Sequence, residues 1–240
     1  MTTLLSAKGL TRSYGKLRAV DGIDWEVRRG QRHALIGCNG AGKSTMLHLL
    51  AGTIRADAGT ITFDGRDITR APAARRARLG ISRTFQTPAL FDTLSGLDNL
   101  IVGALPHVRR RTTARERAER QLEALGLGDC ASIIAGNLSH GRRRLLEIAL
   151  ALVSEPTVLL LDEPAAGLTE ADLERLLHCL DNLPAELSVV LVEHHQDVVT
   201  AVADIVTVLH EGRILTAGKP DEVASHPDVI EVYLGAAVEP

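Results

Sequence analysis

The residues best suited to chemistry form a glycine-rich loop, GCNGAGKST, at residues 37–45. Gly37, Gly42, Lys43 and Ser44 fit the spacing G-x-x-x-x-G-K-[ST], and they follow an apolar strand and precede a helical stretch, as the pattern requires. Glycines here turn backbone N–H groups toward phosphate oxygens, and the helix N-terminus adds positive charge. Lys43 would reach the β- and γ-phosphates, and the Ser44 hydroxyl would coordinate Mg²⁺. The loop therefore predicts a nucleoside triphosphate site rather than a chance glycine turn.

A pair of adjacent carboxylates follows a second apolar run, in TVLLLDEP at residues 157–164. The run places Asp162 at the C-terminal end of a buried strand, where open parallel sheets bind their ligands. Asp162 would hold the Mg²⁺ shell, and Glu163 could polarise an attacking water. Two carboxylates beside a metal and a triphosphate favour hydrolysis, because a kinase must keep water out. A solvated acidic turn is the alternative.

Two adjacent histidines, His194 and His195, follow Glu193 at the end of the apolar run LSVVLV. Beside a triphosphate site, a histidine at this edge of the sheet favours a role near the γ-phosphate. A structural histidine is one alternative and a zinc pair is another. Zinc is the weaker alternative, because adjacent histidines point apart on an extended chain and no third ligand is nearby.

The segment LSHGRRR, at residues 138–144, predicts a helix that Ser139 caps and that begins near Gly141. Arg142, Arg143 and Arg144 would then lie at the positive end of that helix, where cations are disfavoured. An anion docked at this end would remove the conflict, so the segment predicts a second anion site. A solvated arginine turn is the alternative.

The elements that position these residues alternate between strands and helices, which predicts a mostly parallel sheet. A long helical stretch at about residues 93–153 interrupts the alternation and predicts a second lobe. The net charge of -3 disfavours a protein that coats nucleic acid. Three widely spaced cysteines indicate free thiols, no signal peptide is visible, and the longest apolar runs are far too short to span a membrane.

Taken in order, GCNGAGKST, LSHGRRR, LLLDEP and VEHH resemble the nucleotide-binding subunit of an ATP-binding cassette (ABC) transporter over nearly the whole chain. The LSxG segment just before LLLDEP makes this resemblance specific. It implies a single domain over residues 1–240 with the α/β fold of P-loop NTPases of the ABC type. That fold would consist of a RecA-like core with an antiparallel β edge, at about 1–86 and 155–240, and a helical lobe at about 87–154.

A finer resemblance is to the ATPase subunits of branched-chain amino-acid uptake systems. It rests on RTFQTPALFDTLSGLDNLIVG, LEIALAL, DEPAAGL and the tail GRILTAGKPDEVASHPDVIEVYLG. Urea-uptake ATPases share LSHG and much of the tail, so an importer of urea or amides is an alternative. A soluble ABC ATPase of DNA repair or translation is another, although this chain lacks a tandem cassette, a coiled-coil insertion and a basic patch. A small-molecule kinase would have no use for the LSxG helix.

The resemblance implies a function for each matching position. Tyr14 would stack on adenine, Gln86 would touch Mg²⁺ or its water, and Ser139 with Gly141 would close on the γ-phosphate held by a partner copy. The residues implied to bind ATP are Tyr14, Val20, Gly37, Cys38, Asn39, Gly40, Ala41, Gly42, Lys43, Ser44, Thr45, Ser139, His140 and Gly141. Ser44, Gln86 and Asp162 would hold the metal, and Gln86, Glu163 and His194 would serve catalysis.

The implied partners are a second ATPase subunit, identical or paralogous, in a head-to-tail dimer, and the transmembrane permease subunits. A solute-binding protein would act indirectly, no nucleic acid is expected, and the location would be the cytoplasmic face of the cell membrane. Cys38, Arg142, Thr169 and His195 depart from the family pattern, which affects expectations for turnover and dimer geometry rather than for the nucleotide site. The arginines of residues 109–120 predict a solvated helix or a contact with anionic lipid or a membrane subunit.

Overall fold

The computed structural model describes residues 2–84 and 89–235, and the chain divides into two compact units. The first comprises residues 1–76 and 185–240, and the second comprises residues 77–184. Among the described helices, none is long and apolar enough to cross a membrane.

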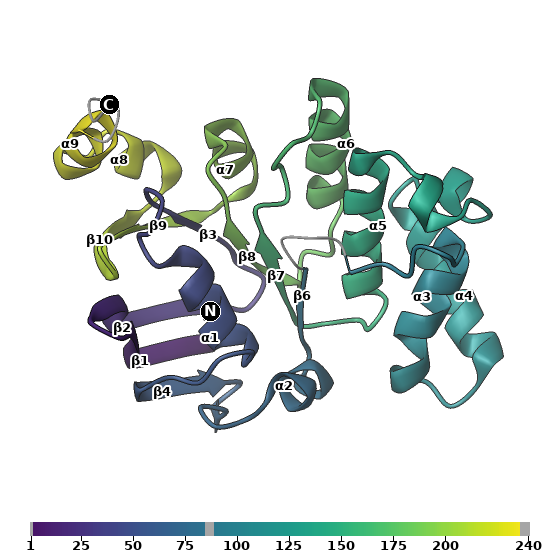
Figure 1. Ribbon diagram of the computed structural model, residues 1–240, viewed down its shortest axis with the longest axis horizontal. Helices are drawn as coiled ribbons and strands as arrows, with labels where there is room; N and C mark the ends of the chain where they lie inside the picture. The colour runs from purple at the N-terminus through teal and green to yellow at the C-terminus, as the bar shows by residue number, and fades with distance from the viewer. Residues whose placement is uncertain (1, 85–88, 236–240) are drawn as a thin grey trace. The chain divides into compact units, whose positions relative to one another are not determined.

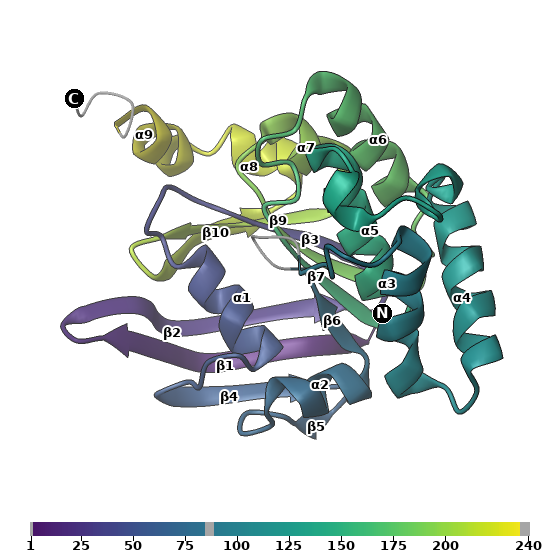
Figure 2. The same cartoon turned by 45° about the vertical axis from the view of Figure 1, so that its right-hand side comes forward.

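An antiparallel sheet in the first unit has the strand order β2-β1-β4-β5 (Figures 1 and 2). Its strands are β1 (Thr3–Tyr14), β2 (Leu17–Arg28), β4 (Ala58–Phe63) and β5 (Arg66–Asp67). Along β2 the buried Ile23, Trp25 and Val27 alternate with exposed polar residues, so one face of this strand is apolar. In the sequence GIDWEV, the same alternation of apolar and polar residues predicts a half-buried strand, and the structure confirms it.

A second layer of strands in the same unit is ordered β10-β9-β3-β8. The parallel strands are β3 (Arg32–Ile36), β8 (Ser188–Val192) and β9 (Ile205–His210), and β10 (Arg213–Gly218) pairs antiparallel with β9. Helix α1 (Lys43–Ala51) packs on β2 and β8. Helices α7 (Gln196–Val202), α8 (Pro220–Ala224) and α9 (Pro227–Gly235) lie on one side of β9 and β3 (Figure 1).

A buried histidine joins the two layers of the first unit. The indole Nε1 of Trp25 donates to His33 Nε2 at 3.1 Å, and Thr207 Oγ1 lies 2.8 Å from the same nitrogen. Burial lowers the pKa of His33 to about 4, so its ring is neutral near neutral pH. A neutral ring can accept the indole hydrogen bond, which links β2 to β3.

The second unit contains the parallel pair β6 (Ile81–Arg83) and β7 (Val158–Asp162). Its helices are α3 (Gly96–Ala104), α4 (Arg111–Ala124), α5 (His140–Leu152) and α6 (Glu170–Asp181), and α2 (Ala73–Leu79) begins in the first unit and ends in the second. Short 3-10 turns lie at Leu105–His107, Gly128–Cys130 and Ala135–Asn137. The predicted cap is confirmed at α5, where Ser139 Oγ accepts the N–H of Arg142 at 3.3 Å.

Helix α4 carries most of the arginine stretch that the sequence analysis singled out. It buries Ala114, Ala118 and Leu122 at intervals of four residues and exposes most of its charges. Arg115 pairs with Glu119 at 2.7 Å one turn away, and Arg117 pairs with Glu155 at 3.0 Å. These contacts favour a solvated, ion-paired helix over a bare cationic surface.

A buried arginine anchors the end of α1. Arg76 is only 2% exposed, and its guanidinium donates to the carbonyl oxygens of Leu49 at 2.7 Å and Leu50 at 2.8 Å, in the last turn of α1. It also donates to Ala71 O at 2.9 Å and Thr69 O at 3.1 Å. Burial lowers its pKa to about 10, so the group stays charged near neutral pH. A helix C-terminus favours such a cation.

We expect Arg76→Met to lower the free energy of unfolding by about 2–4 kcal/mol, because it leaves buried carbonyl oxygens without a donor. Urea denaturation followed by circular dichroism would measure the change. Arg75→Met is the matched control, since Arg75 is exposed on the same helix, and we expect its effect to stay within about 0.5 kcal/mol. Equal stability of the two variants would contradict this account of Arg76.

Candidate functional site

The glycine loop follows β3 directly and leads into α1. Gly37, Gly40 and Gly42 have φ angles of +148°, +81° and +105°, which residues with a Cβ rarely adopt. A Cβ on Gly37 would lie 2.2 Å from the carbonyl oxygen of Leu209, and one on Gly42 would lie 2.2 Å from that of Ala19. The loop backbone therefore passes closer to its neighbouring strands than any side chain allows.

Lys43 is the first residue of α1, and its side chain folds back over the loop. Its ammonium donates to the carbonyl oxygens of Gly37 at 2.8 Å and Cys38 at 2.9 Å, and the residue is only 5% exposed. Gly42 is the N-cap of α1 and supplies no side-chain cap, and the first turn holds no acidic residue. A cation and an uncapped helix start beside a glycine loop fit the phosphates of a nucleotide.

The turn between β9 and β10 also holds the loop in place. The N–H of Gly212 donates to Ala41 O at 3.1 Å, and Gly212 O accepts the N–H of Asp21 at 2.8 Å. Asp21 pairs with Arg213 at 2.7 Å and with Arg18 at 2.9 Å. These two guanidiniums, Arg213 first, lower the pKa of the Asp21 carboxyl. The turn is thus fixed to β2 on one side and to the glycine loop on the other.

The other predicted ATP-binding residues of the first unit differ in exposure. Tyr14 ends β1 with 47% of its surface exposed, and the guanidinium carbon of Arg12 lies 5.0 Å from its ring centroid. Val20 is fully buried in β2. Asn39 and Gly40 are exposed, Ala41 is buried, and Cys38, Ser44 and Thr45 are partly buried. Their contact with a nucleotide stays a prediction.

The histidine pair lies between β8 and α7. The buried Glu193 carboxylate accepts the backbone N–H groups of His194 at 2.8 Å and His195 at 3.1 Å through Oε2, while both histidine side chains are exposed. Glu193 therefore shapes the backbone that presents His194. Among the described residues, no group of three or more histidine, cysteine, aspartate and glutamate side chains could hold a metal ion.

Asp162 ends β7 in the second unit, as the sequence predicted, and is 2% exposed. Its Oδ2 lies 3.7 Å from Nη2 of Arg83, and its backbone N–H donates to Thr84 Oγ1 at 3.3 Å. Burial lowers the pKa of Arg83, while the charges of Asp162 and Glu147 oppose this shift. A buried carboxylate at the C-terminal end of a parallel strand fits a residue that would help to hold Mg²⁺. Gln86, the other predicted metal contact, lies outside the described residues.

Glu163, the next residue, has a strained backbone with φ of +46°. The buried guanidinium of Arg144 donates to its carbonyl oxygen at 2.8 Å and pairs with Glu147 at 2.9 Å. Arg144 thus supports the backbone of the predicted catalytic carboxylate from α5. From residue spacing alone Arg144 was expected to seek an anion like Arg142 and Arg143, because spacing does not show which of three successive arginines points inward.

The arginines at the start of α5 have carboxylate partners within their own unit. Arg142 pairs with Asp129 at 2.8 Å and Arg143 pairs with Asp92 at 2.6 Å, so their conflict with the helix dipole is relieved without an external anion. This corrects the physical reason given for an anion site. The first turn of α5 is closely packed against α6, because a Cβ on Gly141 would lie 2.2 Å from Asp172 Cγ. His140 Nε2 lies 3.3 Å from Ala166 O.

The described site residues therefore form two groups, one in each unit. The first unit brings together the glycine loop, Lys43 and the strand ends that hold them, and it carries Tyr14 and His194. The second unit brings Asp162 and Glu163 together with the start of α5. Arg144 and Gly212 are the supporting residues that sequence reasoning missed.

Comparison with known proteins places this geometry in a family. A family model described as ABC transporter matches residues 20–166, and one described as branched-chain amino acid ATP-binding cassette transporter matches residues 213–239. The chain is 36% identical to the high-affinity branched-chain amino acid transport ATP-binding protein BraF of Pseudomonas aeruginosa, over 98% of each protein. It is 37% identical to LivG, a protein of the same description from Escherichia coli, again over 98% of each.

Solved structures of ATP-binding cassettes also resemble the chain. A nucleotide-free ATP-binding cassette from an ABC transporter matches with a TM-score of 0.87 at 30% identity, covering 97% of this chain and 99% of that one. An ATP-binding cassette in its ADP conformation matches with a TM-score of 0.88 at 30% identity, covering 98% of this chain and 100% of that one. The predicted resemblance, the α/β P-loop fold of the ABC type and the ATPase class are confirmed. The chain belongs to the ATP-binding family of the ABC transporters.

Proposed function

We propose that this chain hydrolyses ATP to energise the import of branched-chain or other amino acids through membrane permease subunits. The glycine loop is the observation that carries the ATP site, because its backbone approaches β2 and β9 too closely for any other residue and Lys43 covers it. The solute class is supported by the names of the BraF and LivG relatives and by the tail match at residues 213–239.

The residues divide the work of hydrolysis among them. Lys43 and the loop N–H groups would bind the β- and γ-phosphates, while Ser44, Asp162 and Gln86 would hold Mg²⁺, which supplies charge neutralisation when bound. Glu163 would polarise the attacking water, and His194 would contact the γ-phosphate. Tyr14 would stack on adenine with its exposed ring.

The start of α5 would complete a site on a second chain, identical or paralogous, in a head-to-tail dimer. Ser139 supports this proposal, because its hydroxyl stands at the N-cap of α5, where the backbone packs too closely on Asp172 for Gly141 to carry a side chain. Dimeric cassettes with ADP and phosphate share the fold at 22% identity and a TM-score of 0.79. In this arrangement a RecA-like core, at about 1–86 and 155–240, would bind the nucleotide, and a helical lobe, at about 87–154, would carry α5.

An exposed apolar patch in the second unit supports docking on a permease. Phe91 is 53% exposed, and Ile133 and Ile134 are each 40% exposed. Their segments lie side by side, because Ala135 N–H donates to Leu94 O at 2.8 Å and Gly96 N–H donates to Ile133 O at 3.0 Å. Exposed apolar side chains on adjoining segments are typical of protein contact surfaces. A permease here would hold the chain at the cytoplasmic face of the membrane and couple it indirectly to a solute-binding protein.

We expect Glu163→Gln to bind Mg-ATP but to hydrolyse it about 10²–10⁴-fold more slowly, because the water loses its polarising carboxylate. Phosphate release and ATP affinity should be measured together. Glu186→Gln is the matched control, because Glu186 is an exposed glutamate of the first unit. Near-normal turnover in Glu163→Gln would remove Glu163 from the catalytic role.

We expect the Glu163→Gln chain to dimerise only with Mg-ATP, and Ser139→Arg added to it to abolish that dimer while the monomer still binds ATP. The arginine side chain would put bulk where the γ-phosphate must fit. Sizing chromatography with light scattering would report the mass.

Two controls separate the signature role of Ser139 from its role as a helix cap. Ser139→Ala also loses the cap, at a cost of about 0.5–2 kcal/mol, but adds no bulk. Ser132→Arg adds the same side chain at an exposed position. A normal dimer in Ser139→Arg would refute the signature assignment. A Glu163→Gln chain that stays monomeric with Mg-ATP would point to a paralogous partner ATPase.

A further inference from the structure

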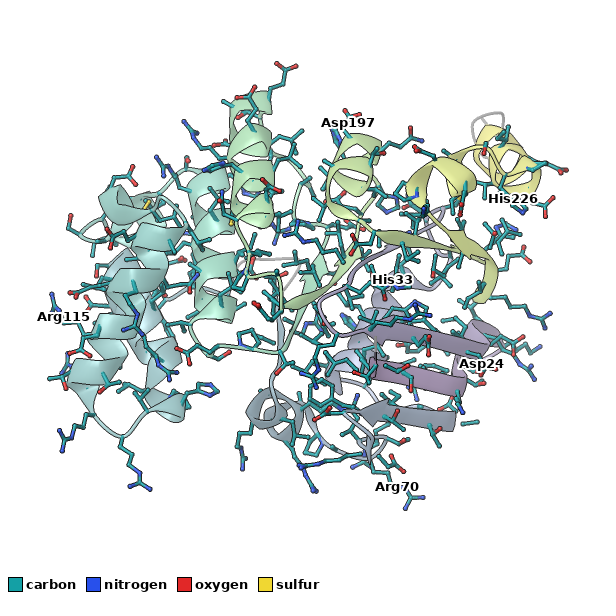
Figure 3. The ribbon with its side chains drawn as sticks, turned by 180° about the vertical axis from the view of Figure 1, so that it is seen from behind. Asp24, His33, Arg70, Arg115, Asp197 and His226 are labelled. Carbon is teal, nitrogen blue, oxygen red and sulfur yellow. The ribbon has the colours of Figure 1, made fainter. Side chains whose placement is uncertain are left out.

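A cavity of about 320 Å³ lies in the first unit among α7, α8, α9 and the ends of β3 and β9. In Figure 3 the labelled Asp197 on α7 and His226, between α8 and α9, lie on the same side of these strands. Its apolar wall is formed by four buried valines and extended by Ile36; the valines are Val199, Val206, Val223 and Val229. Its volume lies at the lower end of the range of small-molecule pockets.

One end of the cavity is polar. Glu193, which is 3% exposed, contributes a buried carboxylate to the lining. His194, Gln196 and Thr200 are exposed and form the mouth. A molecule that fits must therefore combine a branched aliphatic body of a few carbon atoms with a compact polar head. Glu193 favours a cationic group on that head, and the side chains at the mouth can donate to an anionic group.

The C-terminal helix connects this cavity to the glycine loop. Val229 and Ile230 of α9 line the cavity, and two residues later Val232 O lies 3.9 Å from Sγ of Cys38, in the loop itself. The cavity mouth also carries His194, which we assign to the γ-phosphate. The cavity is therefore linked to the proposed ATP site in two ways, through the contact of α9 with the glycine loop and through His194. The wall formed by α8 and α9 lies within the tail that the branched-chain amino acid family model matches, residues 213–239.

We propose that this cavity binds a free α-amino acid with a branched aliphatic side chain, and that the bound amino acid slows ATP hydrolysis. The side chain packs against the valines, the ammonium faces Glu193, and the carboxylate faces His194 and Gln196. A ligand that engages His194 holds it at the cavity mouth and away from the nucleotide. The effect on hydrolysis rests on the proposed function, and it would let the imported solute limit its own uptake.

Calorimetric titration of the full chain with leucine tests the binding step directly. We expect a dissociation constant of about 1 mM or tighter, and alanine to bind at least about tenfold more weakly because it leaves the apolar wall uncovered. Absence of leucine binding, or equal binding of alanine and leucine, would overturn the proposal.

Ala224→Phe tests the location, because Ala224 is an exposed residue of α8 that lines the cavity. Its added ring should fill the mouth, weaken leucine binding at least about tenfold and leave ATP turnover insensitive to leucine. Ala201→Phe is the matched control, since Ala201 is exposed on α7 and does not line the cavity. Leucine binding at normal affinity in Ala224→Phe would place the site elsewhere and overturn the proposal.

A second variant covers the case in which Ala224→Phe does not fold. Ile230→Glu puts a charge on the cavity rim at a position that is 43% exposed, and it should also weaken leucine binding. ATP turnover of the same preparations separates the two proposals. Normal turnover without any response to leucine would overturn the inference alone, whereas leucine binding to a chain without ATPase activity would uphold the cavity and overturn the proposed function.

Discussion

The close approach of the glycine loop to β2 and β9 is the constraint on which the rest of the site depends. At Gly37 and Gly42 the backbone lies against the carbonyl oxygens of Leu209 and Ala19, with no room for a Cβ. Because the loop cannot move toward either strand, its N–H groups and the start of α1 have fixed directions. Lys43 is then held by carbonyl oxygens of the loop itself. Packing against both strands and the Lys43 contacts thus restrain the loop, which reduces the ordering cost of nucleotide binding.

Buried arginines also hold the backbone in place elsewhere in the chain. Arg76 binds the last carbonyl oxygens of α1, at the opposite end from the glycine loop. Arg144 binds the carbonyl oxygen of Glu163, whose backbone is strained. In both cases a buried, planar donor group meets backbone carbonyl oxygens, those of the buried Leu49 and Leu50 and that of the partly buried Glu163. The protein thus uses interior cations to fix the backbone at the ends of functional elements, while most surface ion pairs involve exposed side chains.

The sequence was most informative where a local rule decides the structure. The alternation of Ile23, Trp25 and Val27 predicted β2, and the spacing of glycines around Lys43 predicted the loop. Strand β1 has no such regular alternation, because register shifts interrupt its pairing with β2. Helix α2 buries a single residue, Arg76, so it presents no apolar stripe for periodicity to detect. The partners of Arg142, Arg143 and Arg144 depend on contacts between segments far apart in the chain, which spacing cannot reveal.

The most direct test of the rigid-loop account is the ATP affinity of Gly42→Ala compared with Gly40→Ala. Both glycines have positive φ, so both substitutions strain the backbone, but only at Gly42 does a Cβ meet a neighbouring strand; at Gly40 no atom lies within 4 Å of it. The account predicts that Gly42→Ala weakens ATP binding at least about tenfold more than Gly40→Ala does. This factor corresponds to about 1.4 kcal/mol of binding free energy. Equal affinities in the two variants, both near that of the unmodified chain, would contradict it.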